Sequence, residues 1–506
     1  TVIDLDFKGY LGGEGPGAGK GDSAYYPGGS YGGQGSDGAQ GTIFPPNPTY
    51  GSLRAPTDLG SGSGTDGHGG GAMILDIAGS ASLNGVITAD GKAASSKGNG
   101  SGGSVFISAG SFTGNGSISA DGAATTYTIV GQGGGGRIAL ITDGADFGSL
   151  ALQAYGGGGA NTHRAAAGTI YLETAAQGAG HGTLLIDAAN NIGQIVRATT
   201  LISTSVTDTA VGQLVLANNA RFALANEETF DVFTGWSNGA AFLAGTNSLV
   251  NLAGSGTTRI AGDSTFWHLS ATNPAAVLRF ATNSTQQVQG ILTVQGAENQ
   301  EIVLESETAE SPWFLNMLAG SKVQVDYAAV QDSDASGGEP IATTHSIDND
   351  RNVYWLFGAT TITWTGTESS DWANAANWDL GRLPSLLDTV AIAGSVPHDP
   401  QLDANRTLAA LVILPGGTLS LNGYDLTVNG TAAITGTLAA AGAETIAFKG
   451  DVDFTDGAFI AATSSVALAG EAAQQFRAAG ESFYRLTVAN AGGTVTLADS
   501  VTATEF

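Results

Sequence analysis

Oxygen-bearing side chains with the spacing of a calcium loop lie in the run Asp332-Ser333-Asp334-Ala335-Ser336-Gly337. Calcium loops place oxygen ligands at positions 1, 3 and 5 and a turn-permitting glycine at position 6. Asp332, Asp334 and Ser336 fill the three ligand positions, and Gly337 fills the glycine position. The spacing therefore predicts the first half of a calcium site.

The second half of such a loop is incomplete. Its twelfth position, which normally holds a bidentate Glu, is Thr343. Asp348 and Asp350 can supply carboxylates if the chain folds back on itself. Calcium is thus the candidate cofactor, with the ligand set Asp332, Asp334, Ser336, Asp348 and Asp350. The alternative is an Asp/Ser/Gly turn between strands, without metal.

Catalysis by paired carboxylates is the rival chemistry. A polysaccharide lyase or glycosidase needs two carboxylates about 5–10 Å apart, or a basic group that neutralises a uronate. The chain has only 18 Lys and Arg, and its repeats carry small residues where a catalytic cleft needs large ones. We therefore assign no catalytic residue and expect a protein that is not an enzyme.

Four tryptophans crowd 24 residues of the chain: Trp355, Trp364, Trp372 and Trp378. Exposed aromatic rings there would form a sugar-binding platform. Buried rings would close the end of one stack of strands against the next, since the ends of repeat stacks require capping. We expect the buried arrangement.

Composition restricts the partners. With 45 acidic and 18 basic residues the formal net charge is −27, so nucleic acids and anionic membranes are poor partners. Cysteine is absent, and no apolar run is long enough to insert into a membrane as a helix. An acidic, Lys-poor, Cys-free composition is typical of secreted surface proteins, so we expect an extracellular location.

A sequence repeat indicates which secondary-structure elements position these residues. Ile74, Val105, Ile138 and Ile170 lie in similar segments that begin with a β-like stretch. In the first three copies a turn and a second stretch follow, which ends in Ala-Asp-Gly or Ala-Tyr-Gly. Self-similarity at a period near 32 residues is typical of stacked units that cannot bury their apolar faces alone. Polar glycine runs separate the units, and we expect them to project as loops on one side.

These patterns predict an all-β fold: a right-handed parallel β-helix (solenoid) with Gly-rich loops, in two or three stacked segments. An array of β-sandwich domains is the alternative. We expect a Gly-rich β-helical region with N-terminal Gly-rich loops over 1–190, a β-rich segment ending in the 332–338 block over 191–357, and a second β-helical segment over 358–506. The last segment opens with the Trp-rich block and stops inside a repeat.

Three blocks resemble large secreted bacterial surface proteins with Gly-rich parallel β-helix repeats, of adhesin-like or autotransporter-passenger-like kind. They are 50–62 with the glycine repeats that follow, 331–355, and 364–392 with its Trp-Thr-Gly, Asp-Trp and Asn-Trp pairs. The resemblance implies location and architecture, and it carries no active site.

Together these observations predict a non-enzymatic extracellular structural protein that forms a rigid rod, stalk or filament on a cell surface or in matrix. Copies of itself, assembled head to tail, or neighbouring repeats of a larger protein are the expected partners. An adhesin that binds glycans or host surfaces is the first alternative, and a polysaccharide lyase or glycosidase on a β-helix is the second.

Overall fold

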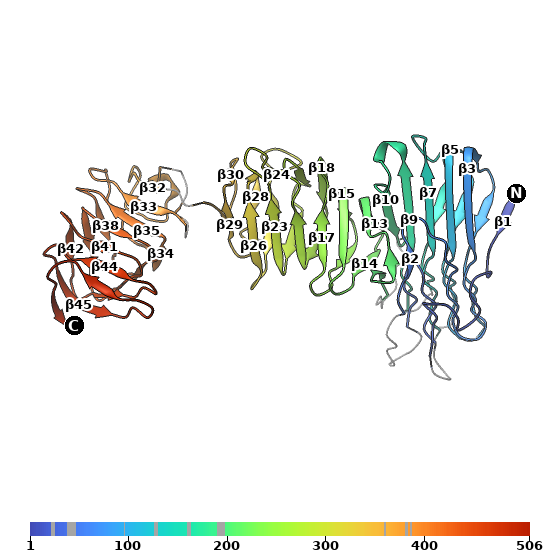
Figure 1. The fold of residues 1–506 in the computed structure, drawn as a ribbon, viewed down its shortest axis with the longest axis horizontal. Helices are drawn as coiled ribbons and strands as arrows, with labels where there is room; N and C mark the ends of the chain where they lie inside the picture. Colours follow the sequence, from blue (N-terminus) through green and yellow to red (C-terminus); the bar gives the residue numbers. More distant parts are fainter. Residues whose placement is uncertain are drawn as a thin grey trace. The chain divides into compact units, whose positions relative to one another are not determined.

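The computed structural model describes residues 1–505 except 22–25, 38–46, 96, 126–129, 159–162, 190–197, 359–360, 380–382 and 385–386. Within these residues the protein is all-β (Figure 1). Its other regular elements are two 3₁₀ turns, η1 (Ala175–Gln177) and η2 (Ala375–Asn377). No helix among the described residues has the length and apolarity to cross a membrane.

The chain divides into two compact units, Thr1–Trp355 and Leu356–Phe506. The expected boundary between residues 190 and 191 falls on the segment 190–197, which lies outside the described residues. Strands in both units pair in parallel at nearly every position, whereas a β-sandwich array is built from antiparallel sheets. The all-β, parallel-strand prediction is therefore confirmed.

The first part of the first unit contains two parallel sheets. Alternation of apolar and polar residues gives each strand one face for the core, since neighbouring side chains of a strand point to opposite sides. One sheet contains β3 (Ala72–Ser82), β5 (Ser104–Thr113), β7 (Arg137–Thr142) and β9 (Thr169–Thr174). The other has the order β1 (Val2–Asp4), β4 (Val86–Thr88), β6 (Ser117–Ser119) and β8 (Ala151–Gln153).

The register confirms three of the four repeat positions and corrects one. Val105 pairs with Ile138, and Ile138 pairs with Ile170. In the first copy, however, Met73 aligns with Val105, and Ile74 is 55% exposed. A shift of one residue turns a side chain to the opposite face of a strand, so Ile74 points to solvent.

The glycine runs lie beside the sheets as a layer of their own, below β3 to β9 in Figure 1. They are buried and hydrogen-bonded to one another, unlike free loops. The amides of Ser101, Gly102 and Gly103 donate to the carbonyls of Ser61, Gly134 and Ala89, which belong to three different segments. Donation in three successive directions fits polyproline II backbone, which has three residues per turn and no internal hydrogen bonds.

Glycine is required in this layer by close approach of backbones. A Cβ on Gly102 would lie 2.1 Å from the carbonyl oxygen of Ala120, and one on Gly135 would lie 2.2 Å from that of Ala154. Both distances are far shorter than a van der Waals contact. The described part of the layer comprises chiefly the segments 28–36, 60–71, 98–103, 131–136 and 165–168.

Chain direction reverses once at the end of this part. β9 pairs antiparallel with β10 (Thr183–Asp187), and β10 pairs in parallel with β13 (Ala210–Ala217). Short strands beside them form two small parallel sheets. These are β11 (Thr200–Ile202), β14 (Arg221–Leu224) and β16 (Ala241–Leu243), and the pair β2 (Gly51–Ser52) with β12 (Val206–Thr207).

The rest of the first unit has three parallel columns of strands, two of which begin at the long strand β15 (Thr229–Asn238). The first half of β15 pairs with β17 and its second half with β18, so two columns start from one strand. The first column is β17 (Leu249–Leu252), β20 (His268–Ala271), β23 (Ile291–Gln295), β26 (Lys322–Asp326) and β29 (Ile341–Thr344). The second is β18 (Thr257–Ala261), β21 (Val277–Phe280), β24 (Ile302–Ser306), β27 (Ala328–Val330) and β30 (Ile347–Asp348). The third is β19 (Ser264–Phe266), β22 (Thr285–Val288), β25 (Trp313–Met317) and β28 (Ser333–Asp334). β31 (Trp355–Phe357) lies at the boundary of the two units.

The second unit also contains three parallel sheets around one apolar core. The largest is β32 (Thr361–Trp364), β33 (Thr389–Ile392), β35 (Ala410–Ile413), β38 (Ala432–Ile434), β41 (Val452–Asp453), β44 (Gln474–Arg477) and β46 (Val495–Leu497). The next is β34 (Arg406–Leu408), β37 (Leu426–Val428), β40 (Thr445–Phe448), β43 (Ser465–Leu468), β45 (Ser482–Val488) and β47 (Thr502–Glu505). The smallest is β36 (Thr418–Ser420), β39 (Thr437–Ala439) and β42 (Ala458–Ile460).

Candidate functional site

The predicted calcium loop lies at the last turns of the first unit, where β28 contains Ser333 and Asp334. Asp332 immediately precedes β28, is only 3% exposed, and has a positive φ of 58°. Its carboxylate forms an ion pair with the Nε of Arg351 and accepts a 3.2 Å hydrogen bond from the amide of Glu310. A buried carboxylate beside a guanidinium already has a counter-charge, so Asp332 is committed to this pair.

The other predicted ligands make local turn contacts. The Asp334 carboxylate accepts the amide of Ser336 at 2.8 Å, and the Asp348 carboxylate accepts the amide of Asp350 at 3.0 Å. Both are side-chain-to-backbone bonds two residues along, which define Asx turns. Asp350 also pairs with Arg351 at 3.1 Å.

The five predicted ligands therefore share one region, and Arg351 lies among their carboxylates. Within the described ranges, no three His, Cys, Asp or Glu side chains are grouped so as to hold a metal ion. Calcium binding stays a prediction. Sequence spacing did not identify Arg351, because its partner Asp332 lies on the preceding turn of the stack.

The tryptophans are buried, as expected. Trp364, Trp372 and Trp378 have exposures of 0%, 1% and 3%, and their rings contact one another at centroid distances of 4.8–6.4 Å. Trp364 belongs to β32, the edge strand of the largest sheet in the second unit, so the three rings cover that end of its core. Trp355 belongs to the first unit, where its indole Nε1 donates to Ser333 Oγ at 3.0 Å.

An aspartate ladder connects four successive turns of the first unit. Asp6, Asp90 and Asp121 each follow a strand of the sheet β1-β4-β6-β8. The Asp6 carboxylate accepts the amide of Asp90 at 2.8 Å, that of Asp90 accepts the amide of Asp121 at 2.7 Å, and that of Asp121 accepts the amide of Tyr155 at 2.7 Å. Side chains thus continue the backbone ladder where the strands end.

Two carboxyl groups of the ladder, those of Asp90 and Asp121, have raised pKa values. Burial raises the pKa of Asp121 to about 7, and the neighbouring charge of Asp90 adds to this rise. Burial also raises the pKa of Asp90. The sequence shows the Ala-Asp-Gly ending as a feature of the repeat. It does not show that the aspartate joins successive turns, because the hydrogen bonds run between turns.

A buried cation joins the glycine layer to the sheet. Arg137 is 0% exposed; its Nε donates to the carbonyl of Tyr50 at 3.1 Å and its Nη1 to Thr169 Oγ1 at 3.0 Å. Its guanidinium lies 5.4 Å from the ring centroid of Tyr31, close enough for a cation–π contact. Burial lowers the pKa of Arg137.

The N-terminal end of the first unit presents an open strand edge. β1 is the edge strand of its sheet, and β3 pairs with β5 on one side only among the described strands. Val2 is 65% exposed and Ile3 40% exposed, and Ile74 of β3 is exposed as well. Unpaired backbone groups and apolar side chains at one edge form a surface on which a further strand can pair.

No family model, no curated protein and no solved structure matches this chain.

Proposed function

We propose that the protein is a non-enzymatic extracellular structural element, in which each unit is a right-handed parallel β-helix that acts as a stiff rod or stalk. The observation that carries this proposal is the long succession of parallel pairings within each unit, for example Leu249 with His268 and Leu292 with Val323, with one antiparallel pair, β9 with β10, among the named strands. Each turn is hydrogen-bonded to the next along two or three columns, so bending the stack requires breaking many hydrogen bonds at once.

Handedness follows from general stereochemistry. Connections between parallel strands of one sheet are right-handed in nearly all proteins, because right-twisted strands pack back onto the sheet only in that sense. Each turn that joins parallel strands of the proposed helix is such a connection. An experimental structure in which the turns are left-handed would overturn this part of the proposal.

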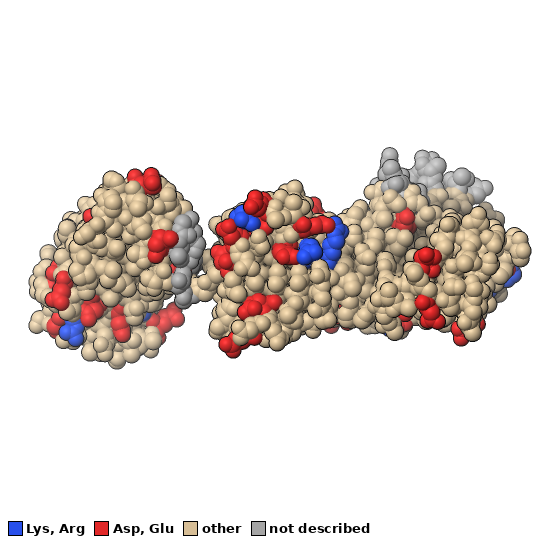
Figure 2. Space-filling model, turned by 90° about the horizontal axis from the view of Figure 1, so that it is seen from above, with Lys and Arg blue, Asp and Glu red and all other residues tan. Residues whose placement is uncertain are grey.

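The surface charge supports an extracellular rod that does not collapse onto its neighbours. Figure 2 shows acidic residues distributed over the visible face of both units, with few basic ones. A net charge of −27 disfavours nonspecific association with acidic surfaces and favours solubility. The described acids are mostly tied into ladders, turns and ion pairs, which are structural roles.

Head-to-tail assembly is the partner proposal. The open edge at β1 offers backbone groups and the apolar side chains of Val2 and Ile3. At the other end of the chain β46 and β47 are edge strands, and Leu497 is 45% exposed. Pairing of these two edges between copies is a heterologous contact, and it gives an open filament where the rotation between copies does not close into a ring.

Sedimentation velocity over a wide range of protein concentration, with electron microscopy of the same samples, tests the assembly. We expect concentration-dependent filaments in the wild type and their loss in Val2→Lys with Ile3→Lys, since charges on an edge strand block pairing. The control is Val488→Lys, which adds one positive charge, against two in the edge variant, at an exposed position on β45. Monodisperse monomers of the wild type at high concentration would overturn self-assembly.

A further inference from the structure

A groove opens in the first unit where a column of strands is interrupted. β16 is the last strand of the sheet β11-β14-β16, and β19 is the first strand of the sheet β19-β22-β25-β28. No described strand joins these two edges. The space between them has a volume of about 390 Å³, which lies in the range of sites for small ligands.

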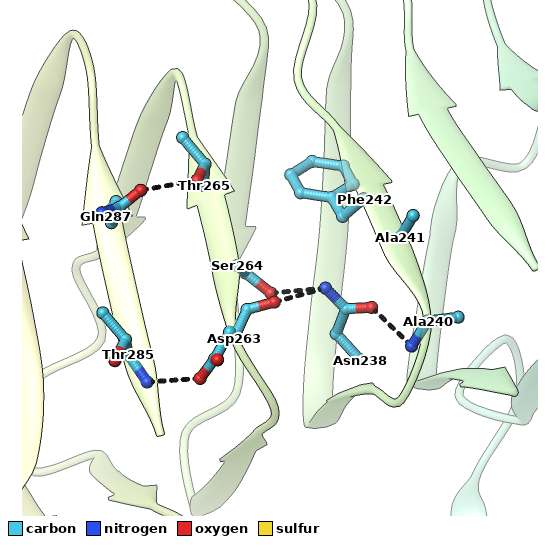
Figure 3. A pocket seen from close by; sticks show the side chains of 9 residues that line it. All are labelled: Asn238, Ala240, Ala241, Phe242, Asp263, Ser264, Thr265, Thr285 and Gln287. Atoms are coloured by element: carbon cyan, nitrogen blue, oxygen red, sulfur yellow. Dashed lines mark hydrogen bonds between the residues drawn. The ribbon is translucent and has the colours of Figure 1, made fainter. Parts of the chain in front are cut away.

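The floor of the groove is held by side chains instead of a backbone ladder (Figure 3). The Asn238 amide Nδ2 donates to the carbonyl of Asp263 at 2.6 Å and to Ser264 Oγ at 3.0 Å. Its Oδ1 accepts the amide of Ala240 at 3.2 Å. Ser264 Oγ also receives the indole Nε1 of Trp236 at 2.9 Å. These contacts connect the two edges and fix the shape of the groove before any ligand arrives.

One wall is aromatic. Phe242 projects from β16 toward the gap in Figure 3. Its ring contacts Trp236 edge-on at 4.8 Å and Phe266 at 5.6 Å between centroids. The ring is therefore held rigidly by the core while part of it lines the groove.

The other wall contains polar side chains with hydrogen-bonding atoms that make no hydrogen bond to a described residue. Gln287 Oε1 accepts the hydroxyl of Thr265 at 3.0 Å, which leaves the Nε2 donors without a partner among the described residues. Asp263 Oδ1 accepts the amide of Thr285 at 2.8 Å, and no described residue donates to its Oδ2. The groove thus offers amide donors, a carboxylate acceptor and the Thr285 hydroxyl within one small space.

We propose that this groove binds a neutral saccharide. Sugar rings present apolar C–H faces that pack on an aromatic ring, together with hydroxyls that both donate and accept hydrogen bonds. Phe242 suits the apolar face, while Asp263 and Gln287 suit the hydroxyls. Asp263 is the one charged residue among those that line the groove, so uronates and sulfated sugars are disfavoured. The proposal is independent of rod assembly.

Isothermal titration calorimetry and saturation-transfer NMR on the full chain test it, with methyl glucoside, methyl galactoside, cellobiose, lactose and N-acetylglucosamine as neutral probes. Glucuronate is the anionic comparison. We expect at least one neutral probe to bind with a Kd of about 1 mM or tighter, and glucuronate to bind more weakly.

Groove variants locate the binding. Gln287→Ala removes the amide donors, and Asp263→Asn replaces the charged acceptor with a neutral amide; we expect each to raise Kd about three- to tenfold. Phe242→Leu keeps apolar volume but removes the ring, with a similar expected loss. The matched control is Gln324→Ala, because Thr293 and Gln324 form the same Thr–Gln contact between neighbouring strands, at 3.4 Å, outside the groove.

Circular dichroism and melting temperature confirm that each variant is folded. Failure of every neutral probe to bind the folded wild type would overturn the proposal. Binding that glucuronate matches, or that Gln287→Ala and Asp263→Asn leave unchanged, would also overturn it. Loss of filaments without loss of saccharide binding, or the reverse, separates this proposal from that of assembly.

Discussion

The raised pKa of Asp121 makes stability of the first unit depend on pH in an unusual direction. The carboxyl titrates near pH 7 in the folded protein and near its ordinary value of 3.8 when unfolded. Between these values the folded state keeps a proton that the unfolded state has released. Stability from this group is therefore fully present below about pH 4 and is lost as pH rises toward 7.

The magnitude follows from the size of the shift. A shift from 3.8 to about 7 corresponds to about 4 kcal/mol, at roughly 1.4 kcal/mol per pH unit. This is an upper value, because part of the carboxyl remains accessible to water. Asp90, whose pKa is also raised, contributes in the same direction.

Asp121→Asn tests this reasoning. The asparagine Oδ1 can still accept the Tyr155 amide, and Gln153, which now donates to Asp121 Oδ2 at 2.8 Å, can rotate its amide to accept instead. The variant lacks the ionisable group, so we expect it to match the wild type near pH 4. Near pH 8 we expect it to be more stable by up to about 4 kcal/mol.

Guanidinium unfolding followed by circular dichroism at pH 4, 6 and 8 and constant ionic strength measures the difference. Asp76→Asn, on the exposed face of β3, is the control that removes one negative charge without burial. A stability difference between Asp121→Asn and wild type that is flat across pH, or that favours the wild type at pH 8, would refute the argument.

Four further outcomes are expected. Gly102→Ala forces a Cβ against backbone and should destabilise the first unit by about 3 kcal/mol or more, while Gly79→Ala, with open space around its Cβ, should be near neutral by denaturant unfolding. Trp372→Ala should cost the second unit about 3–5 kcal/mol in the same assay, with little effect on the first unit. Arg351→Met should lower the melting temperature by leaving the buried Asp332 without its counter-charge, and an unchanged melting temperature would contradict that pairing. If calcium binds as predicted, chelator should lower the melting temperature of the wild type but not of Asp334→Asn; equal responses would exclude that site.

Much of the architecture was readable in the residues themselves. The period near 32 residues and the alternation of apolar and polar side chains predicted stacked strands, and the parallel pairing of Val105, Ile138 and Ile170 confirms that interpretation. Burial of the tryptophans also followed from the need to close a stack. These features are local or strictly periodic, so they can be recognised in the sequence alone.

Contacts between turns could not be predicted in the same way. Arg351 meets Asp332, Asp90 meets Asp121, and Asn238 bridges to Ser264, each across a different number of residues. The segments between strands vary in length from turn to turn, and this length decides which side chains face one another.

The sequence by itself therefore determined that this chain stacks short strands and which residue types fill the core. Only the tertiary structure decided the inward residue of the first repeat, the close packing of the glycine runs and the gap between β16 and β19. The physical reason is that strand faces alternate every residue, so a register shift of one position reverses them, and register is set between turns rather than within them.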